Sequence, residues 1–174
     1  MEKIFLKDGN FLVVLIIQKQ ADFFILAGEK YKQLTIYQNS IDSFDEAIGC
    51  LIKLQNNIRI AHCYIKKTDI YFLNSEYEKC ISCLQSAVMY YIKEKNYIMG
   101  IKTYIEYINN FIKENNLEIA ENILLKCLND CENNIDNTFF QIYGDVVFSK
   151  YLNILCWNKK NEEAIKMNRK SYKN

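Results

Sequence analysis

The chain has 174 residues, 50% of them hydrophobic and 25% charged, with no proline and only five glycines. Twenty-two Lys and Arg against 21 Asp and Glu leave a net charge of +1, which argues against nucleic-acid binding as the main role, because such binding relies on basic surfaces. Nothing in this composition interrupts long helices, and little of it supports tight hairpin turns between strands. An all-α protein is the natural interpretation.

The first element in chain order is residues 1–18, which contain the apolar run Phe11–Ile17. A membrane-spanning helix needs roughly 20 apolar residues, so this run is too short to cross a bilayer. No small-residue cleavage site follows it, as a signal peptide would require. We expect a divergent terminal helix or strand that packs on the first hairpin.

Apolar residues at helical spacing predict eight helices in residues 19–174. Their expected ranges are 19–34, about 40–54, 58–73, about 76–94, 97–113, 117–131, 139–157 and 161 to near the C-terminus. Asn39 or Ser40 is the candidate N-cap of the second helix. Ser75 with Glu78 forms a capping-box pattern at the start of the fourth.

Pairs of these helices form a repeating unit, clearest in residues 57–94. Its aromatic pair Tyr64 and Tyr71 recurs as Phe24 and Tyr31, as Tyr104 and Phe111 and, after a slightly longer step, as Phe148 and Leu155. The second helix of each unit carries, at one position, Ser40, Cys80, Ala120 and Ala164 in turn. A fixed period of this size is typical of stacked helix hairpins. We therefore predict a single tetratricopeptide-like array over residues 19–174, a right-handed α-α superhelix of about four antiparallel hairpins.

The seven cysteines do not form a recognisable disulfide or metal framework. Their odd number and their positions in predicted helices favour a reducing, cytoplasmic compartment. Cys80 and Cys83 have the CxxC spacing, but no second such pair exists and His62 is the only histidine. Because a tetrahedral zinc site needs four ligands, we interpret both cysteines as packing residues, and Cys127 and Cys131 in the same way.

No catalytic arrangement is evident. His62 has no nucleophile at a suitable spacing, and the five glycines are isolated, so no phosphate-binding loop is present. We expect no enzymatic activity, no cofactor and no metal. The remaining candidates are lysines of the central hairpins, which would attract an acidic partner if several shared one face. They are Lys66, Lys67, Lys93, Lys95, Lys102 and Lys113.

The amino-acid sequence of the hairpins resembles that of the soluble NSF attachment proteins (SNAPs). The similarity lies in DEAIGCLIKLQNNIRIAHCYIKKTDIYF, in EKCISCLQSAVMYY and in the helix that contains GIKTY, residues 100–104. It extends over roughly residues 21–170. The order of the hairpins, the lengths of their connections and the period of the repeat agree together, although no single motif is diagnostic.

This resemblance implies an adaptor of vesicle fusion. Such a protein lays one face of its helical array along an acidic, syntaxin-containing SNARE bundle and recruits the ATPase NSF, which disassembles the bundle. One docking lysine of the family falls on Lys102, and a second falls on Val146, with Lys150 one turn away. Lys66 and Lys67 complete the candidate contacts. Phe5, Leu6 and Phe11 fall near the family's membrane-touching loop, so a cytoplasmic protein with peripheral membrane contact is expected.

The family's sequence continues beyond the point where this chain stops, into a region that stimulates NSF. The resemblance therefore implies weak or absent stimulation. Two other functions stay open. One is a general tetratricopeptide-type scaffold that binds a short peptide, and the other is an enzyme with a cysteine-based site.

Overall fold

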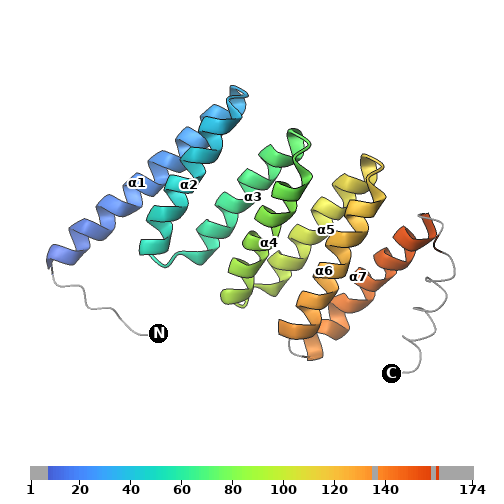
Figure 1. Cartoon of the computed structure of the whole chain (residues 1–174). Helices are drawn as coiled ribbons and strands as arrows, with labels where there is room; N and C mark the ends of the chain where they lie inside the picture. Colours follow the sequence, from blue (N-terminus) through green and yellow to red (C-terminus); the bar gives the residue numbers. More distant parts are fainter. Residues whose placement is uncertain (1–7, 135–136, 158–159, 161–174) are drawn as a thin grey trace. The chain divides into compact units, whose positions relative to one another are not determined.

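The computed structural model describes residues 8–134, 137–157 and 160, and the side chains of residues 11–129, 147–157 and 160. All regular structure in these residues is helical, and no strand occurs among them, which confirms the all-α prediction. The helices of this part of the chain are α1 (Asp8–Gln33), α2 (Tyr37–Lys53), α3 (Asn57–Leu73), α4 (Tyr77–Lys93), α5 (Tyr97–Lys113), α6 (Leu117–Asn134) and α7 (Asn137–Trp157) (Figure 1). The predicted eighth helix, residues 161 onward, lies outside the described residues.

Helices α2 to α6 follow one another with a constant step. They begin at residues 37, 57, 77, 97 and 117, so every second helix restarts the same hairpin unit. The predicted fifth helix has the observed bounds, and the third and sixth begin within one residue of them. The repeat predicted from the sequence is therefore the repeat of the structure.

Each connection from α1 through to α6 uses the same backbone turn. One residue per turn has a positive φ, and none of them is glycine: Thr35 (60°), Gln55 (53°), Ser75 (58°), Lys95 (55°) and Asn115 (61°). After α2, for example, the Asn56 N–H donates to the Leu51 carbonyl and the Gln55 N–H to the Ile52 carbonyl, both at 3.0 Å. These two bonds define the Schellman motif, which satisfies the last carbonyls of a helix and reverses the chain.

The turns correct the predicted caps. Ser75 is the positive-φ residue of the α3–α4 turn, and the N-cap of α4 is Glu76, whose side chain makes no capping bond. Asn39 and Ser40 lie inside α2, where the buried Ser40 hydroxyl donates to the Gly28 carbonyl at 2.6 Å. A side-chain cap does form at Asn56, which accepts from the Arg59 N–H at 3.2 Å.

Helix α1 also corrects the N-terminal boundary. It begins at Asp8 rather than at the predicted Lys19, and it crosses the expected border between residues 18 and 19 without a break. The polar residues Gln18, Lys19 and Gln20, which follow the apolar run, are half-buried or exposed positions within one continuous helix.

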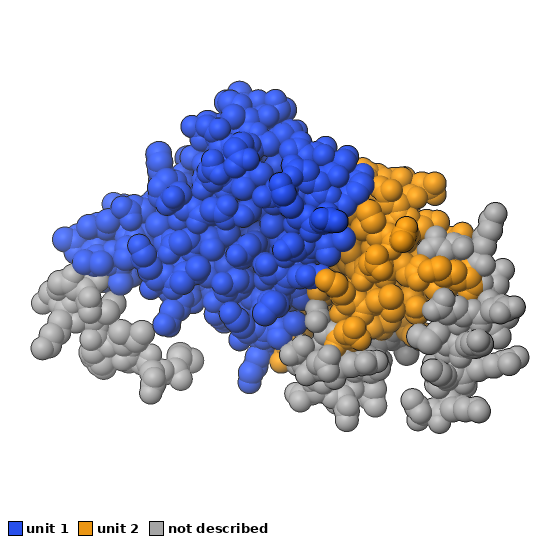
Figure 2. All heavy atoms as spheres, in the orientation of Figure 1, with its two compact units in different colours: residues 1–96 blue, residues 97–174 orange. Residues whose placement is uncertain are grey.

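The chain folds into two compact units, residues 1–96 and 97–174 (Figure 2). In the first unit α1 packs on α2, α2 on α3 and α3 on α4. Its core includes Phe44, Leu51, Ile60 and Ile70, which are at most 1% exposed. In the second unit α5 packs on α6 and α6 on α7, with Phe111, Leu124 and Ile154 fully buried. Stacked antiparallel hairpins are thus present as predicted.

Candidate partner-binding surface

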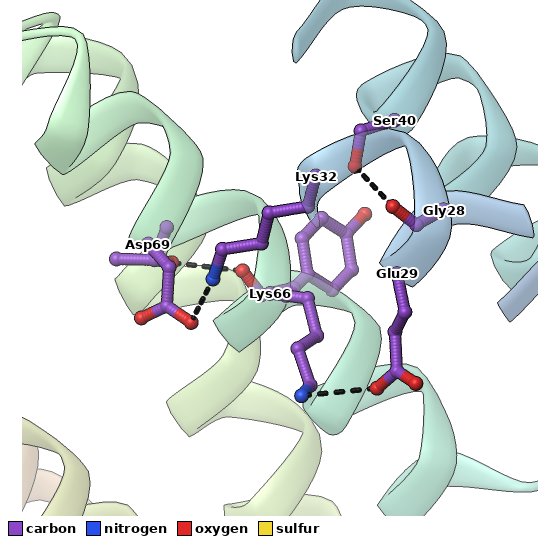
Figure 3. Close-up of polar contacts among 8 residues, drawn as sticks. Gly28, Glu29, Lys32, Ser40, Lys66 and Asp69 are labelled. Atoms are coloured by element: carbon purple, nitrogen blue, oxygen red, sulfur yellow. Dashed lines mark hydrogen bonds and ion pairs between the residues drawn. The ribbon is translucent and has the colours of Figure 1, made fainter. Parts of the chain in front are cut away.

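Ion pairs join α1 to α3 in the first unit. Lys32 Nζ lies 2.8 Å from Asp69 Oδ2, and Lys66 Nζ lies 3.1 Å from Glu29 Oε1 (Figure 3). Arg59 pairs with Asp22 in the same way. Each pair links residues 37 apart in sequence, so the two helices run side by side in one direction with a fixed register. The charges of this α1–α3 face largely neutralise one another.

Lys66, one of the predicted contact residues, belongs to this set of ion pairs. Its side chain is 42% exposed and its partner Glu29 is 41% exposed. An exposed pair of this kind is worth at most about 1 kcal/mol, so Lys66 can exchange Glu29 for another carboxylate at low cost. It remains a secondary candidate for a contact with an acidic partner.

Lys67 lies elsewhere, although it is the next residue. It is 8% exposed, and its Nζ lies 2.5 Å from Asp45 Oδ1 of α2 and 5.7 Å from the centre of the Tyr64 ring. Burial by itself would lower the pKa of Lys67, but the hydrogen bond and the charge of Asp45 outweigh that effect and raise it. Lys67 is a structural cation of the first unit and is not part of an exposed basic surface.

Lys102 has the surroundings expected of a contact residue. It is exposed on α5, on the side opposite the buried residues Tyr104 and Phe111. No ion pair of Lys102 is found within the described part of the chain. Its charge is therefore available to an incoming group without the loss of an existing partner.

Lys150 is brought to the same side of α5. Its Nζ donates to Asn109 Oδ1 at 2.8 Å, which ties α7 to α5 inside the second unit. Asn109 follows Lys102 by two helical turns, about 10 Å along the axis, and so shares its side of the helix. The structure thus unites two of the four predicted lysines, Lys102 and Lys150, on an α5–α7 face. Val146 has no described side chain.

The predicted membrane contacts fall at the start of the chain. Phe5 and Leu6 lie outside the described residues, and Phe11 is 63% exposed near the beginning of α1. The apolar residues that directly follow Phe11, up to Ile16, are 37–60% exposed. Residues 11–16 therefore make this part of α1 apolar on all its sides.

One described helix, Phe11–Gln33 within α1, is long and apolar enough to cross a membrane by length and composition. This corrects the length estimate from the sequence, which counted only the run Phe11–Ile17. The second half of the helix nevertheless packs within the first unit. Ala21 and Gly28 are buried there, and Asp22, Glu29 and Lys32 pair with α3. A bilayer span would break these contacts.

The cysteines were predicted to be packing residues. Cys80, Cys83 and Cys127 are buried, which confirms that interpretation for them. The side chain of Cys131 is not described. Burial raises the pKa of Cys83. The His62 pKa is lowered by burial and by the charges of Lys66 and Arg59. Within the described residues no group of three or more His, Cys, Asp or Glu could hold a metal ion.

Sequence reasoning missed the acidic partners of the lysines. A usable signal existed, because opposite charges recur at one constant spacing, at residues 22 and 59, 29 and 66, and 32 and 69. That spacing is close to the step of the hairpin repeat and indicates pairing between equivalent helices. The spacing therefore distinguishes lysines that already pair with a carboxylate of this chain from lysines that can pair with a partner protein.

Comparison with known proteins gives one result that bears on this surface. The family model described as "Soluble NSF attachment protein, SNAP" matches residues 16–126, which is more than half of the chain. No curated protein matches the sequence. The matched range covers α1 from residue 16 onward, all of α2 to α5, and the first half of α6.

Proposed function

Since the chain belongs to the soluble NSF attachment protein family, we propose that it is a non-enzymatic adaptor that binds an assembled SNARE complex. It recruits the ATPase NSF to that complex for disassembly in vesicle fusion and intracellular protein transport. The observation that carries the proposal is the family match over residues 16–126, which includes the helix that bears Lys102.

The lysines of the second unit supply the docking contacts in this proposal. A SNARE bundle is acidic on its surface, as the family resemblance implies, so an exposed cation without a partner gains most from contact with it. Lys102 meets that description, with Lys150 on the same side of α5. Lys66 contributes less, because Glu29 already balances its charge.

A pull-down with an assembled, syntaxin-containing SNARE bundle tests this role. Wild-type chain is expected to be retained at low salt, and Lys102→Glu to be retained far less. Lys126→Glu is the matched control, since Lys126 is also exposed in the second unit but lies on α6. Equal retention of all three proteins would exclude docking through Lys102, and no retention of the wild type would exclude SNARE binding.

Recruitment of NSF is measured separately, as the ATPase rate of NSF with the SNARE bundle and this chain. An increase that requires all three components supports the adaptor role. An unchanged rate together with intact SNARE binding would leave a SNARE-binding protein that does not activate NSF.

We assign the protein to the cytoplasm, in peripheral contact with membranes through Phe11 and its neighbours at the N-terminal end of α1. Apolar side chains of this exposure gain free energy at a lipid surface. Flotation with phosphatidylcholine and phosphatidylserine vesicles tests the contact. Phe11→Ser should reduce it, and an unchanged variant would contradict it.

A second function, peptide binding by a tetratricopeptide-type scaffold, is favoured by one feature of the first unit. A pocket of about 300 Å³ is lined by Ile52, Gln55, Asn57, Ile60, Tyr90 and Lys93. Its lining combines apolar side chains with amides and a lysine, which suits one apolar side chain with a nearby carboxylate. Under this function Lys93→Glu and Tyr90→Ala would abolish partner binding, whereas Lys102→Glu would leave it unchanged.

A further inference from the structure

Helix α1 carries an exposed apolar stripe on the side that faces away from its own unit. Leu12, Ile16, Phe23 and Leu26 are 60%, 47%, 66% and 56% exposed. The opposite side of the helix packs on the core of the first unit through Ala21 and Gly28, which are buried. At about 100° per residue, all four stripe residues fall within one narrow sector of the helix.

The spacing of the stripe is that of a helix-pairing seam. Positions 12, 16, 19, 23, 26 and 30 alternate steps of four and three, the pattern by which one helix packs along another. Lys19 and Lys30 occupy the two remaining positions, and both are exposed. Within the described residues Lys19 has no ion pair, and Lys30 donates only to Gln33.

The width of the stripe distinguishes between two possible occupants, a partner helix and a lipid surface. Around positions 11–16 the helix is apolar on all sides, so that end suits either environment. Around Phe23 and Leu26 the stripe is narrow, because Gln20 borders it on one side and Asp22 and Glu29 on the other. A strict seam of this kind is typical of helix–helix packing, whereas a membrane-bound helix has a wider apolar face.

The two lysines specify the charge of the occupant. Lys19 and Lys30 are separated by about three helical turns, or about 16 Å along the axis. A second copy of α1 packed parallel and in register, or antiparallel about Lys19, would bring lysines together, which is unfavourable because like charges repel. A copy packed antiparallel about residue 21 would place Lys19 opposite Phe23 and Lys30 opposite Leu12, so neither lysine would meet a carboxylate. An amphipathic helix with two carboxylates at the matching spacing in its own apolar seam would neutralise both.

We propose that the outer face of α1, formed by Leu12, Ile16, Lys19, Phe23, Leu26 and Lys30, binds an acidic amphipathic helix of a partner protein. The site is formed by residues of the first unit other than the lysines proposed to contact the SNARE complex, and its test does not require that contact. In a stacked helical array an apolar helix face is normally covered by a neighbouring helix, because each repeat cannot bury its apolar residues alone. The acidic helix shields this one.

The test uses two synthetic helical peptides with leucines at the seam positions. One has two glutamates in the seam at the spacing of Lys19 and Lys30, and the other has two lysines there. Fluorescence anisotropy should show that the wild-type chain binds the glutamate peptide at least tenfold more tightly. The double variant Lys19→Glu/Lys30→Glu should reverse this preference. The control Lys53→Glu/Lys126→Glu, which has the same change of charge on residues that are exposed and do not belong to the seam, should retain it.

The apolar contribution is tested with Phe23→Ser, an exposed substitution that leaves the core intact. It should weaken binding of the glutamate peptide at least tenfold, with an unchanged circular dichroism spectrum. Three results would overturn the proposal. They are equal binding of both peptides, self-association in sedimentation that Phe23→Ser removes, and binding to anionic vesicles through Phe23 in the absence of peptide binding.

Discussion

The close approach of α1 to α2 at Gly28 leads to a quantitative prediction. A Cβ at this position would lie 2.9 Å from Phe44 Cε1 and Cζ. The Phe44 ring is fully buried and cannot move into solvent. Gly28→Ala therefore forces a core rearrangement, which typically costs about 1–3 kcal/mol. Against this stands a gain of about 1 kcal/mol, because alanine is the better helix former.

Gly49→Ala is the matched control. Gly49 lies in α2 of the same unit, and a Cβ there would meet nothing within 4 Å. That variant should gain about 1 kcal/mol of stability from helix propensity alone. The difference between the two variants removes the propensity contribution and isolates the contact with Phe44, at about 1–3 kcal/mol.

Urea denaturation followed by circular dichroism measures both free energies of unfolding. A double variant that combines Gly28→Ala with Phe44→Leu should recover part of the contact cost, because the two sites are coupled through one contact. If Gly28→Ala proves as stable as Gly49→Ala, the proposed close packing of α1 on α2 is wrong.

Three further outcomes are expected. Thr35→Gly should stabilise the protein by about 0.5–1 kcal/mol in thermal melts, because Thr35 has a φ of 60° and a β-branched residue is strained there. Asn115→Gly should give a smaller gain, since asparagine tolerates this conformation, and an equal gain would contradict the explanation by strain. Stability should fall in alkaline solution. Burial raises the pKa of Cys63 from 9.0 to about 11. The stability that this protonated thiol contributes is therefore complete below pH 9 and is lost as the pH rises through 11. The pKa of Lys67 is also raised, which adds a further loss of stability at higher pH. Cys63→Ala should flatten the decline of the urea midpoint between pH 9 and 11. Site-resolved alkylation of the native protein should label exposed Cys156 well before the five thiols that are buried among the described side chains. Rapid labelling of one of those five would instead support a reactive cysteine site.

The sequence was sufficient for the helices and for their repeat, because the apolar period and the recurring aromatic residues reflect the core directly. Helix ends were harder. The turns place Thr35, Gln55, Ser75 and Lys95 at positive φ, where glycine is usual. Ser75 therefore looked like an N-cap, although it ends the preceding turn.

The candidate site was predictable only in part. Lys66 and Lys67 are adjacent in sequence but point to different helices, and only the positions of Glu29 and Asp45 reveal which lysine is buried. Lys102 was selected through the resemblance, and its exposure agrees with a contact role. Its relation to Lys150 depends on Asn109, which has no distinguishing feature in the sequence.

The most direct test of the adaptor role is a titration of the assembled SNARE bundle with the wild-type chain and with Lys102→Glu, at low and at physiological salt. We predict saturable binding that weakens as salt rises, and a loss of about tenfold on charge reversal, equivalent to about 1.4 kcal/mol. Absence of binding at low salt, or an affinity that neither salt nor Lys102→Glu changes, would contradict the account.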